Sequence, residues 1–213
     1  LYLSASTVIT AREFQNRSRL LIYPLILFVM AETIIQVALP ELHVTWLCVT
    51  LLSVLYFIYC SEMWNQLDAL TGLLNQNSYL KQTGGVRCKG GVLVVFDVDD
   101  FKQINDRYGH IQGDLCLAGI AECIKKSYAN FGYCYRIGGD EFCVLLKNGG
   151  NEGRCKQEFL QRLQEKRGEI AFLPTVSYGS APFSGEDIVK VKDRADQDMY
   201  QYKKERKNRK RLS

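Results

Sequence analysis

The feature that most restricts what this sequence can fold into is a long stretch with almost no charge. Residues 20–60 carry only two formal charges, Glu32 and Glu41. Within this stretch, residues 20–40 and 42–60 each come close to the ~20 apolar residues that an α-helix needs to cross a bilayer. The short connection predicts a transmembrane helical hairpin. The alternative is a buried helical hairpin of a globular domain, but the remaining sequence is small for covering it on all sides.

The charges around this hairpin predict its orientation. Arg12, Arg17 and Arg19 precede the first span, and the turn between the spans contains no Lys or Arg. The positive-inside rule therefore places both ends of the hairpin, and everything after residue 60, in the cytoplasm. The chain begins with Leu and an apolar segment, so residues 1–19 are interpreted as the end of a missing N-terminal part with further spans, followed by a cytoplasmic loop.

Charge and cysteine content exclude two other classes of function. The chain has a net charge of +4, but residues 203–211 alone contribute +6, seven Lys or Arg against one Glu, so the rest sums to −2. This balance does not favour general nucleic-acid binding. The eight cysteines form no Cys-x-x-Cys pair, and the sequence contains only two histidines that could complete a zinc site. They are predicted to be small buried apolar residues in a reducing compartment rather than zinc ligands or disulfides.

After a short segment, 61–67, which is expected to be a helix leading out of the membrane, the pattern changes to alternating strands and helices. Residues 91–97 (GVLVVFD) form an unbroken apolar run, which is typical of a central strand buried on both faces. Short strand patterns and amphipathic helix patterns then follow one another, with a hairpin around the Gly-Gly pair. The sequence predicts an α/β domain over residues 68–213, with a central sheet flanked by helices. The remaining strands are expected at residues 133–137, 142–146 and 175–181.

Acidic side chains gather where two of these strands begin or end. Asp97 and its neighbours Asp99 and Asp100 close the central strand, and Asp140 and Glu141 lie in the hairpin turn. A single Asp-x-Asp is commonly only a solvated strand end. If the hairpin pairs beside the central strand, however, the two acidic groups meet and offer the hard oxygen ligands that Mg²⁺ binds together with phosphates. The two glycines before the acids, Gly138 and Gly139, would let a phosphate approach the backbone.

These residues also carry a family resemblance. Residues 135–142, YRIGGDEF, resemble the signature of the GGDEF family of bacterial diguanylate cyclases. Four further segments resemble other motifs of that family, in order and at similar spacing, so that the resemblance covers about residues 65–210. These segments are DALTGLLN at 68–75, FDVDDFKQIND at 96–106 with the following Gly-His and Gly-Asp pairs, SYG at 177–179 and ADQDMYQYK at 195–203.

The resemblance implies a palm-like nucleotidyl cyclase fold that condenses two GTP molecules into cyclic di-GMP with release of pyrophosphate. It implies dependence on Mg²⁺ or Mn²⁺, and a homodimer in which two cyclase domains, each holding one GTP, face each other. Together with the apolar spans, it leads us to expect a multi-pass protein of the bacterial inner membrane with a cytoplasmic catalytic domain. The alternative within the family is a catalytically inactive GGDEF domain that binds nucleotide or regulates a partner.

The resemblance also implies roles for individual residues. The metal is expected at Asp97, the backbone carbonyl of Val98, and Asp140. Asp140 is also expected to accept the proton of the attacking 3′-hydroxyl, with Glu141 as a neighbouring carboxylate of the catalytic site that binds the metal or orients the reacting groups. An Asp at position 114 suits guanine, because a carboxylate can accept hydrogen bonds from both N1 and N2 of the base. The substrate-binding positions are Lys102, Asn105, His110, Asp114, Gly138, Gly139 and Lys203.

One position departs from many active members of the family. Their inhibitory product site, Arg-x-x-Asp, ends six positions before the first Gly of the signature, where this chain has Ala129 and Gly132. The charged groups that would bind the product there are missing. We therefore expect no product inhibition through this site.

Overall fold

The computed structural model describes residues 45–84 and 90–212, together with six positions between 27 and 38. The chain divides into two units, Leu1–Asn65 and Gln66–Ser213, which are described separately. Most of the predicted first span and all of residues 1–19 lie outside the described residues.

In the first unit, the described helix is α2, Thr45–Trp64. Trp46, Phe57 and Ile58 are among the large apolar side chains that it exposes. Within the described part of the chain, no helix combines the length and hydropathy that crossing a bilayer requires.

The predicted helix over residues 61–67 extends too far. The structure ends α2 at Trp64, and the backbone of Leu67 instead forms an isolated antiparallel bridge with Leu74. Pairing with Leu74 requires extended backbone, which is incompatible with a helix continuing through Leu67.

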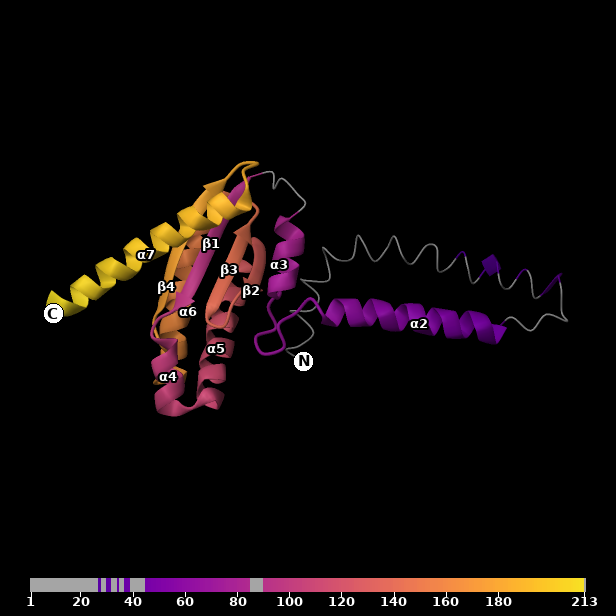
Figure 1. The fold of residues 1–213 in the computed structure, drawn as a ribbon, viewed down its shortest axis with the longest axis horizontal. Helices are drawn as coiled ribbons and strands as arrows, with labels where there is room; N and C mark the ends of the chain where they lie inside the picture. Colours follow the sequence, from indigo (N-terminus) through magenta and orange to yellow (C-terminus); the bar gives the residue numbers. More distant parts are fainter. Residues whose placement is uncertain are drawn as a thin grey trace. The chain divides into compact units, whose positions relative to one another are not determined.

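The second unit contains a four-stranded antiparallel sheet in the order β2-β3-β1-β4 (Figure 1). The central strand of the prediction is β1, which pairs with β3 on one side and β4 on the other, and its predicted position is confirmed. The predicted hairpin is β2 and β3. The strands are β1 Gly91–Val98, β2 Gly132–Arg136, β3 Glu141–Leu146 and β4 Val176–Phe183.

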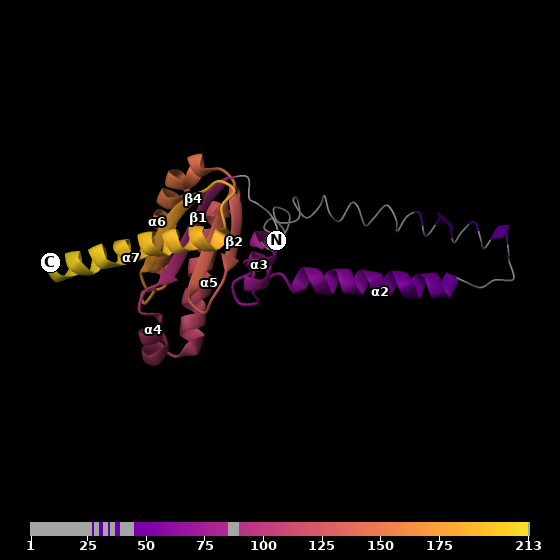
Figure 2. The same cartoon turned by 45° about the horizontal axis from the view of Figure 1, so that its top comes forward.

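Helices cover both faces of this sheet. On one face α5 and α6 pack against the sheet, and α7 crosses the opposite face (Figures 1 and 2). Two shorter helices, α3 and α4, follow the 68–75 segment and β1 respectively. The helices are α3 Gln76–Thr83, α4 Phe101–Tyr108, α5 His110–Tyr128, α6 Glu152–Glu169 and α7 Ile188–Leu212, and the 3-10 turn η1, Gly149–Asn151, precedes α6.

The side chains of β1 explain why both faces must be covered. Their directions alternate with the strand period of two, so Phe96 belongs to the apolar cluster under α5 and α6, whereas Val95 belongs to the cluster under α7. Both side chains are buried, with 1% and 2% exposure. Phe96 also makes edge-on ring contacts with Tyr128 and Phe159, whose centroids lie 5.7 and 5.1 Å away. A strand that is apolar on both faces is stable only inside such a three-layer arrangement.

The cysteines of this unit pack as predicted. The five that the structure describes are buried and free, namely Cys116, Cys123, Cys134, Cys143 and Cys155. Burial raises the pKa of Cys116 and of Cys123 to about 11, and of Cys134 to about 12. These thiols therefore stay protonated at neutral pH and serve as packing residues.

Helix α7 lies very close to β4 because of a glycine. A Cβ at Gly179 would come within 2.2 Å of both the carbonyl oxygen of Ala195 and the backbone nitrogen of Met199. Next to it, the backbone N–H of Ser180 donates to the carboxylate of Asp198 at 2.9 Å. This close approach fixes the position of α7 across the sheet.

The close contact predicts a strong effect of Gly179→Ala. The added methyl group would meet backbone atoms on α7, which cannot rotate away as a side chain can, so the free energy of unfolding should fall by about 3 kcal/mol. Gly168→Ala is the matched control, because a Cβ there would meet nothing within 4 Å, and it should cause no loss. Urea unfolding of both variants measures the difference, and equal stability would contradict the close contact.

Candidate active site

The acidic residues at the end of β1 and in the β2–β3 turn meet, as the sequence predicts. Asp97 lies opposite Glu141 in the antiparallel register of β1 and β3. One residue further, the backbone N–H of Val98 donates to the carbonyl oxygen of Asp140 at 3.2 Å. The pairing of β1 with β3 therefore brings Asp97, Val98 and Asp140 to one edge of the sheet.

A lysine from α7 reaches the same edge. The Nζ of Lys203 lies 2.5 Å from an oxygen of Asp97 and 3.5 Å from Asp99. Burial alone would lower the pKa of Lys203, but the two carboxylates outweigh it and raise that pKa above its ordinary value. Lys203 is therefore a fixed positive charge beside the predicted metal ligands, 106 residues away from Asp97 in the sequence.

Asp99 has hydrogen-bond and ion-pair partners that the sequence did not predict. Its carboxylate accepts hydrogen bonds from the hydroxyls of Thr175 and Ser177, each at 2.7 Å, and it forms an ion pair with Arg206 at 3.0 Å. Arg206 also donates to the carbonyl oxygen of Val176 at 3.3 Å. Asp99 thus joins the end of β1 to the start of β4 and to α7.

One signal in the sequence does point to Arg206. It follows Lys203 by three residues, and residues three apart on a helix lie on the same face. A helix that directs Lys203 toward the end of β1 therefore directs Arg206 to the same place, where the Asp-x-Asp pattern supplies a second carboxylate.

A second arginine holds the turn between β2 and β3. Arg136 forms an ion pair with Asp68 at 3.1 Å and donates to the carbonyl oxygen of Gly139 at 2.7 Å. Thr71 donates its hydroxyl to Asp68 at 2.6 Å. Burial opposes the ionisation of Asp68, but the hydrogen bonds from Thr71 and Arg136 outweigh it and hold the pKa of Asp68 below its ordinary value. The 68–75 segment therefore supports the hairpin turn.

The two glycines of this turn differ in their surroundings. A Cβ on Gly138 would lie 3.1 Å from the carboxylate of Glu141, whereas a Cβ on Gly139 would meet nothing within 4 Å. Neither has the positive φ that demands glycine. Open space at Gly139 is compatible with the predicted approach of a phosphate, which stays a prediction.

The predicted base-binding residues gather at the corner between α4 and α5. Gly109, with a φ of +85°, ends α4 and begins α5. Its N–H donates to the carbonyl oxygen of Asn105 at 2.8 Å, and its own carbonyl accepts from Gly113 at 3.1 Å, so hydrogen bonding continues through the corner. His110 is the first residue of α5, and Asp114 is exposed one turn later.

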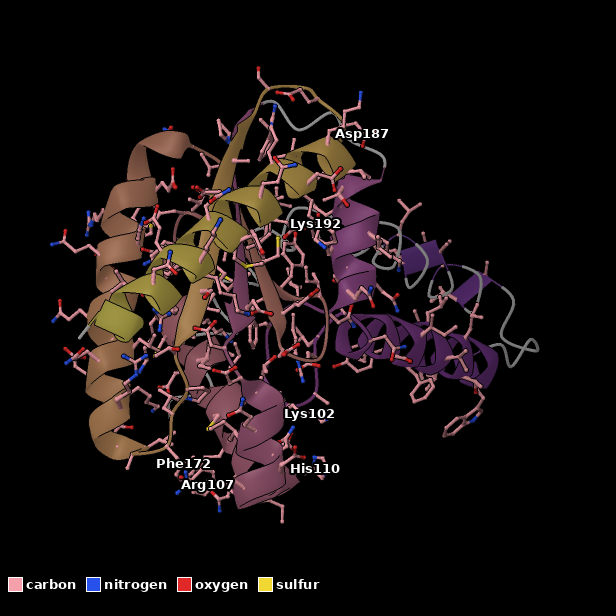
Figure 3. All side chains as sticks on the ribbon, turned by 60° about the vertical axis from the view of Figure 1, so that its left-hand side comes forward. Lys102, Arg107, His110, Phe172, Asp187 and Lys192 are labelled. Atoms are coloured by element: carbon pink, nitrogen blue, oxygen red, sulfur yellow. The ribbon has the colours of Figure 1, made fainter. Side chains whose placement is uncertain are left out.

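His110 exposes its side chain at this corner, whereas Lys102 exposes its side chain at the other end of α4 (Figure 3). The beginning of α7, marked by Asp187, lies at the other end of the unit in the same view. Lys102 is the second residue of α4, which starts only three residues after β1 ends. The corner is thus connected directly to the acidic edge of the sheet.

The donor set at the acidic edge fits a divalent cation. Two carboxylates and one backbone carbonyl are hard oxygen ligands of the kind that Mg²⁺ accepts when substrate phosphates supply the rest. Asp97 already pairs with the ammonium group of Lys203, so the edge attracts positive charge. Among the described residues, no group of three or more His, Cys, Asp or Glu side chains could hold a metal ion.

Comparisons with known proteins agree with this arrangement. Residues 65–209 match the family described as "Diguanylate cyclase, GGDEF domain". The chain belongs to this GGDEF family. Over 154 residues it is 32% identical to diguanylate cyclase DgcS of Shewanella oneidensis, covering 68% of this chain and 52% of DgcS. It is 35% identical over 159 residues to diguanylate cyclase DgcP of Pseudomonas aeruginosa, covering 67% of this chain and 23% of DgcP. The chain thus spans about half of one relative and about a quarter of the other.

Solved structures show the same fold. A microbial GGDEF domain studied with bis-(3,5)-cyclic di-GMP is 32% identical, with a TM-score of 0.51, covering 65% of this chain and 93% of that one. The GGDEF domain of DgcB from Caulobacter crescentus, in complex with c-di-GMP, is 27% identical, with a TM-score of 0.52, covering 65% and 90%. These likenesses confirm the predicted sheet flanked by helices.

Proposed function

We propose that this chain is a diguanylate cyclase, which condenses two GTP molecules into cyclic di-GMP and releases two pyrophosphates. Membership of the GGDEF family and the names of its relatives support this reaction class. The observation that carries the proposal is the meeting of Asp97, Asp140 and Lys203 at one end of the sheet, each from a different element. Carboxylates and a fixed ammonium group are what a reaction at a metal-bound triphosphate requires.

The proposed roles at the acidic edge follow from the chemistry of these groups. Asp97, the carbonyl of Val98, and Asp140 would hold Mg²⁺ or Mn²⁺, which when bound supplies charge stabilisation to the triphosphate. The Asp140 carboxylate would accept the proton of the attacking 3′-hydroxyl, and Glu141 would lie beside it as a second carboxylate. Lys203 would exchange its contact with Asp97 for the negative oxygens of the phosphates.

Side chains at the α4–α5 corner would recognise the guanine base. The Asp114 carboxylate can accept hydrogen bonds from N1 and N2 of guanine, whereas adenine has no such pair of donors. Asn105 and His110 would contribute polar groups around the same nucleotide, and Lys102 would contribute charge toward its phosphates. Gly138 and Gly139 would leave the backbone of the hairpin turn open to the triphosphate.

One such domain holds one nucleotide, so the reaction needs a partner domain. We propose a homodimer through the cyclase domain, in which the 3′-hydroxyl of each GTP faces the α-phosphate of the other.

The alternative is a GGDEF domain that binds GTP without turning it over. The complete signature, Gly138 to Phe142, together with Asp97, favours the enzyme, because the acids that the chemistry uses are present.

The first test is conversion of GTP by the purified chain with Mg²⁺, with products separated by chromatography. We expect cyclic di-GMP, its loss when Mg²⁺ is withheld, and a rate at least ~100-fold lower in Asp140→Ala, because a general base contributes about that much. Asp193→Ala removes an exposed carboxylate from α7 and should retain the rate. GTP binding without any product, even at high protein concentration, would favour the receptor alternative.

We further propose that product does not inhibit through the Arg-x-x-Asp position. Gly132 begins β2, and a Cβ there would lie 2.2 Å from the carbonyl oxygen of Leu145 on β3. The strand pairing therefore has no room for an Asp at this position, and Ala129 carries no charge. Initial rates measured with increasing added cyclic di-GMP should stay constant through the micromolar range. Half-inhibition by micromolar product would contradict the proposal.

Finally, we propose that the region before Gln66 attaches the cyclase to the bacterial inner membrane through two or more spans. The support is the nearly uncharged sequence of residues 20–60, the arginines before it, and the exposed apolar side chains of α2. After cell fractionation and an alkaline wash, the whole chain should stay with the membranes, whereas residues 66–213 alone should not. Recovery of the whole chain in the wash would contradict membrane attachment.

A further inference from the structure

The α4–α5 corner contains a glycine, and a neighbouring polar group fills the space that a side chain at this position would occupy. Gly113 is buried on α5, and an ideal Cβ there would lie 1.9 Å from Oδ1 of Asn105 and 3.1 Å from its Cγ. The same Cβ would be 3.3 Å from the ring of Phe101. Asn105 therefore occupies the space that any other residue at position 113 would need.

Packing holds the side-chain oxygen of Asn105 in place. Its Oδ1 is buried, and within the described part of the chain it accepts no hydrogen bond. Burying an acceptor without a donor is unfavourable, so this orientation is not one that the side chain would adopt for its own stability. With Oδ1 turned inward against Gly113, the amide N–H groups remain as the polar end of Asn105 that a ligand can meet.

The backbone prevents the two residues from moving apart. Asn105, Gly109 and Gly113 are linked by successive hydrogen bonds of 2.8 and 3.1 Å through the corner. A Cβ at position 113 would therefore displace the Asn105 side chain rather than the helices. Asp114 follows Gly113 directly, so the same turn of α5 fixes both the amide and the carboxylate.

We propose that Gly113 is a positioning residue for guanine recognition, because its lack of a side chain fixes Asn105 as a hydrogen-bond donor beside Asp114. This inference rests on the proposed function. Guanine has an acceptor, O6, next to the donors N1 and N2, so a base-binding site needs a donor beside an acceptor. Adenine has the opposite arrangement at these positions, and an amide and a carboxylate placed together would discriminate between the two. His110 marks this corner in Figure 3.

The experiment compares equilibrium binding of GTP and of ATP, both with Ca²⁺ in place of Mg²⁺ to slow turnover, across four forms of the whole chain. These are the native chain, Gly113→Ala, Asn105→Ala, and the double variant Asn105→Ala/Gly113→Ala. Gly119→Ala is the matched control, since Gly119 is also buried on α5 but its Cβ would meet only side-chain atoms of Ile170 and Lys166, at 3.3 Å or more.

We expect Gly113→Ala to raise the dissociation constant for GTP at least tenfold and to reduce the preference for GTP over ATP, while Gly119→Ala leaves both unchanged. Asn105→Ala should have an effect of similar size. Because both substitutions disturb the same group, the double variant should bind GTP no more weakly than Asn105→Ala. If Gly113 had a purely structural role, the double variant would instead lose GTP affinity by the product of the two single-variant factors.

The outcomes separate this inference from the proposed function. If the native chain does not bind GTP, the proposed function fails. If it binds, but Gly113→Ala stays within twofold of it or the losses multiply, the inference about Gly113 fails. If Gly113→Ala does not fold, folding and GTP binding of the double variant test the inference, because that variant lacks the Asn105 atoms that the new Cβ would meet first. Failure of the double variant to fold would overturn the inference.

Discussion

A largely buried carboxylate, Asp99, connects the three elements on which the candidate site depends. It accepts hydrogen bonds from two hydroxyls on or next to β4 and pairs with Arg206 on α7. Removing one partner of such a pair is costly, typically about 3–5 kcal/mol for fully buried pairs, because the other charge is left without compensation. Asp97 lies two residues before Asp99, and Lys203 lies three residues before Arg206. The Asp99–Arg206 pair therefore determines where Lys203 meets Asp97.

The sequence predicted the strands well and the short helices poorly. An apolar run such as residues 91–97 allows few alternatives, because a strand buried on both faces must be central in a covered sheet. Helix α4 buries none of its residues fully, and α3 buries only Tyr79, so neither has the apolar face that a periodicity argument detects. The predicted helix over 61–67 ended early because Leu67 pairs with Leu74, a contact that no local pattern encodes.

The same distinction applies to the candidate site. The meeting of the two acidic groups was predictable, because a hairpin that pairs beside β1 must bring its turn to the end of that strand. The hydroxyl partners of Asp99 were not predictable, since Thr175 and Ser177 are 76 and 78 residues away and reach it only through the pairing of β1 with β4. Gly113 was likewise visible in the sequence as part of a Gly-Asp pair, but its contact with Asn105 exists only when α4 and α5 pack together.

The short connection between β1 and α4 joins the two halves of the candidate site. Only Asp99 and Asp100 separate them, and Asp100 adopts a φ of +55°, the left-handed conformation that turns the chain sharply. Because Asp99 is held by β4 and α7, the start of α4 cannot shift independently of the acidic edge. The corner that carries Asn105 and Asp114 is thereby fixed relative to Asp97. A nucleotide bound at both places would have its base and its phosphates positioned by one connected set of backbone and ion-pair contacts, which is what a reaction between two separately bound nucleotides demands.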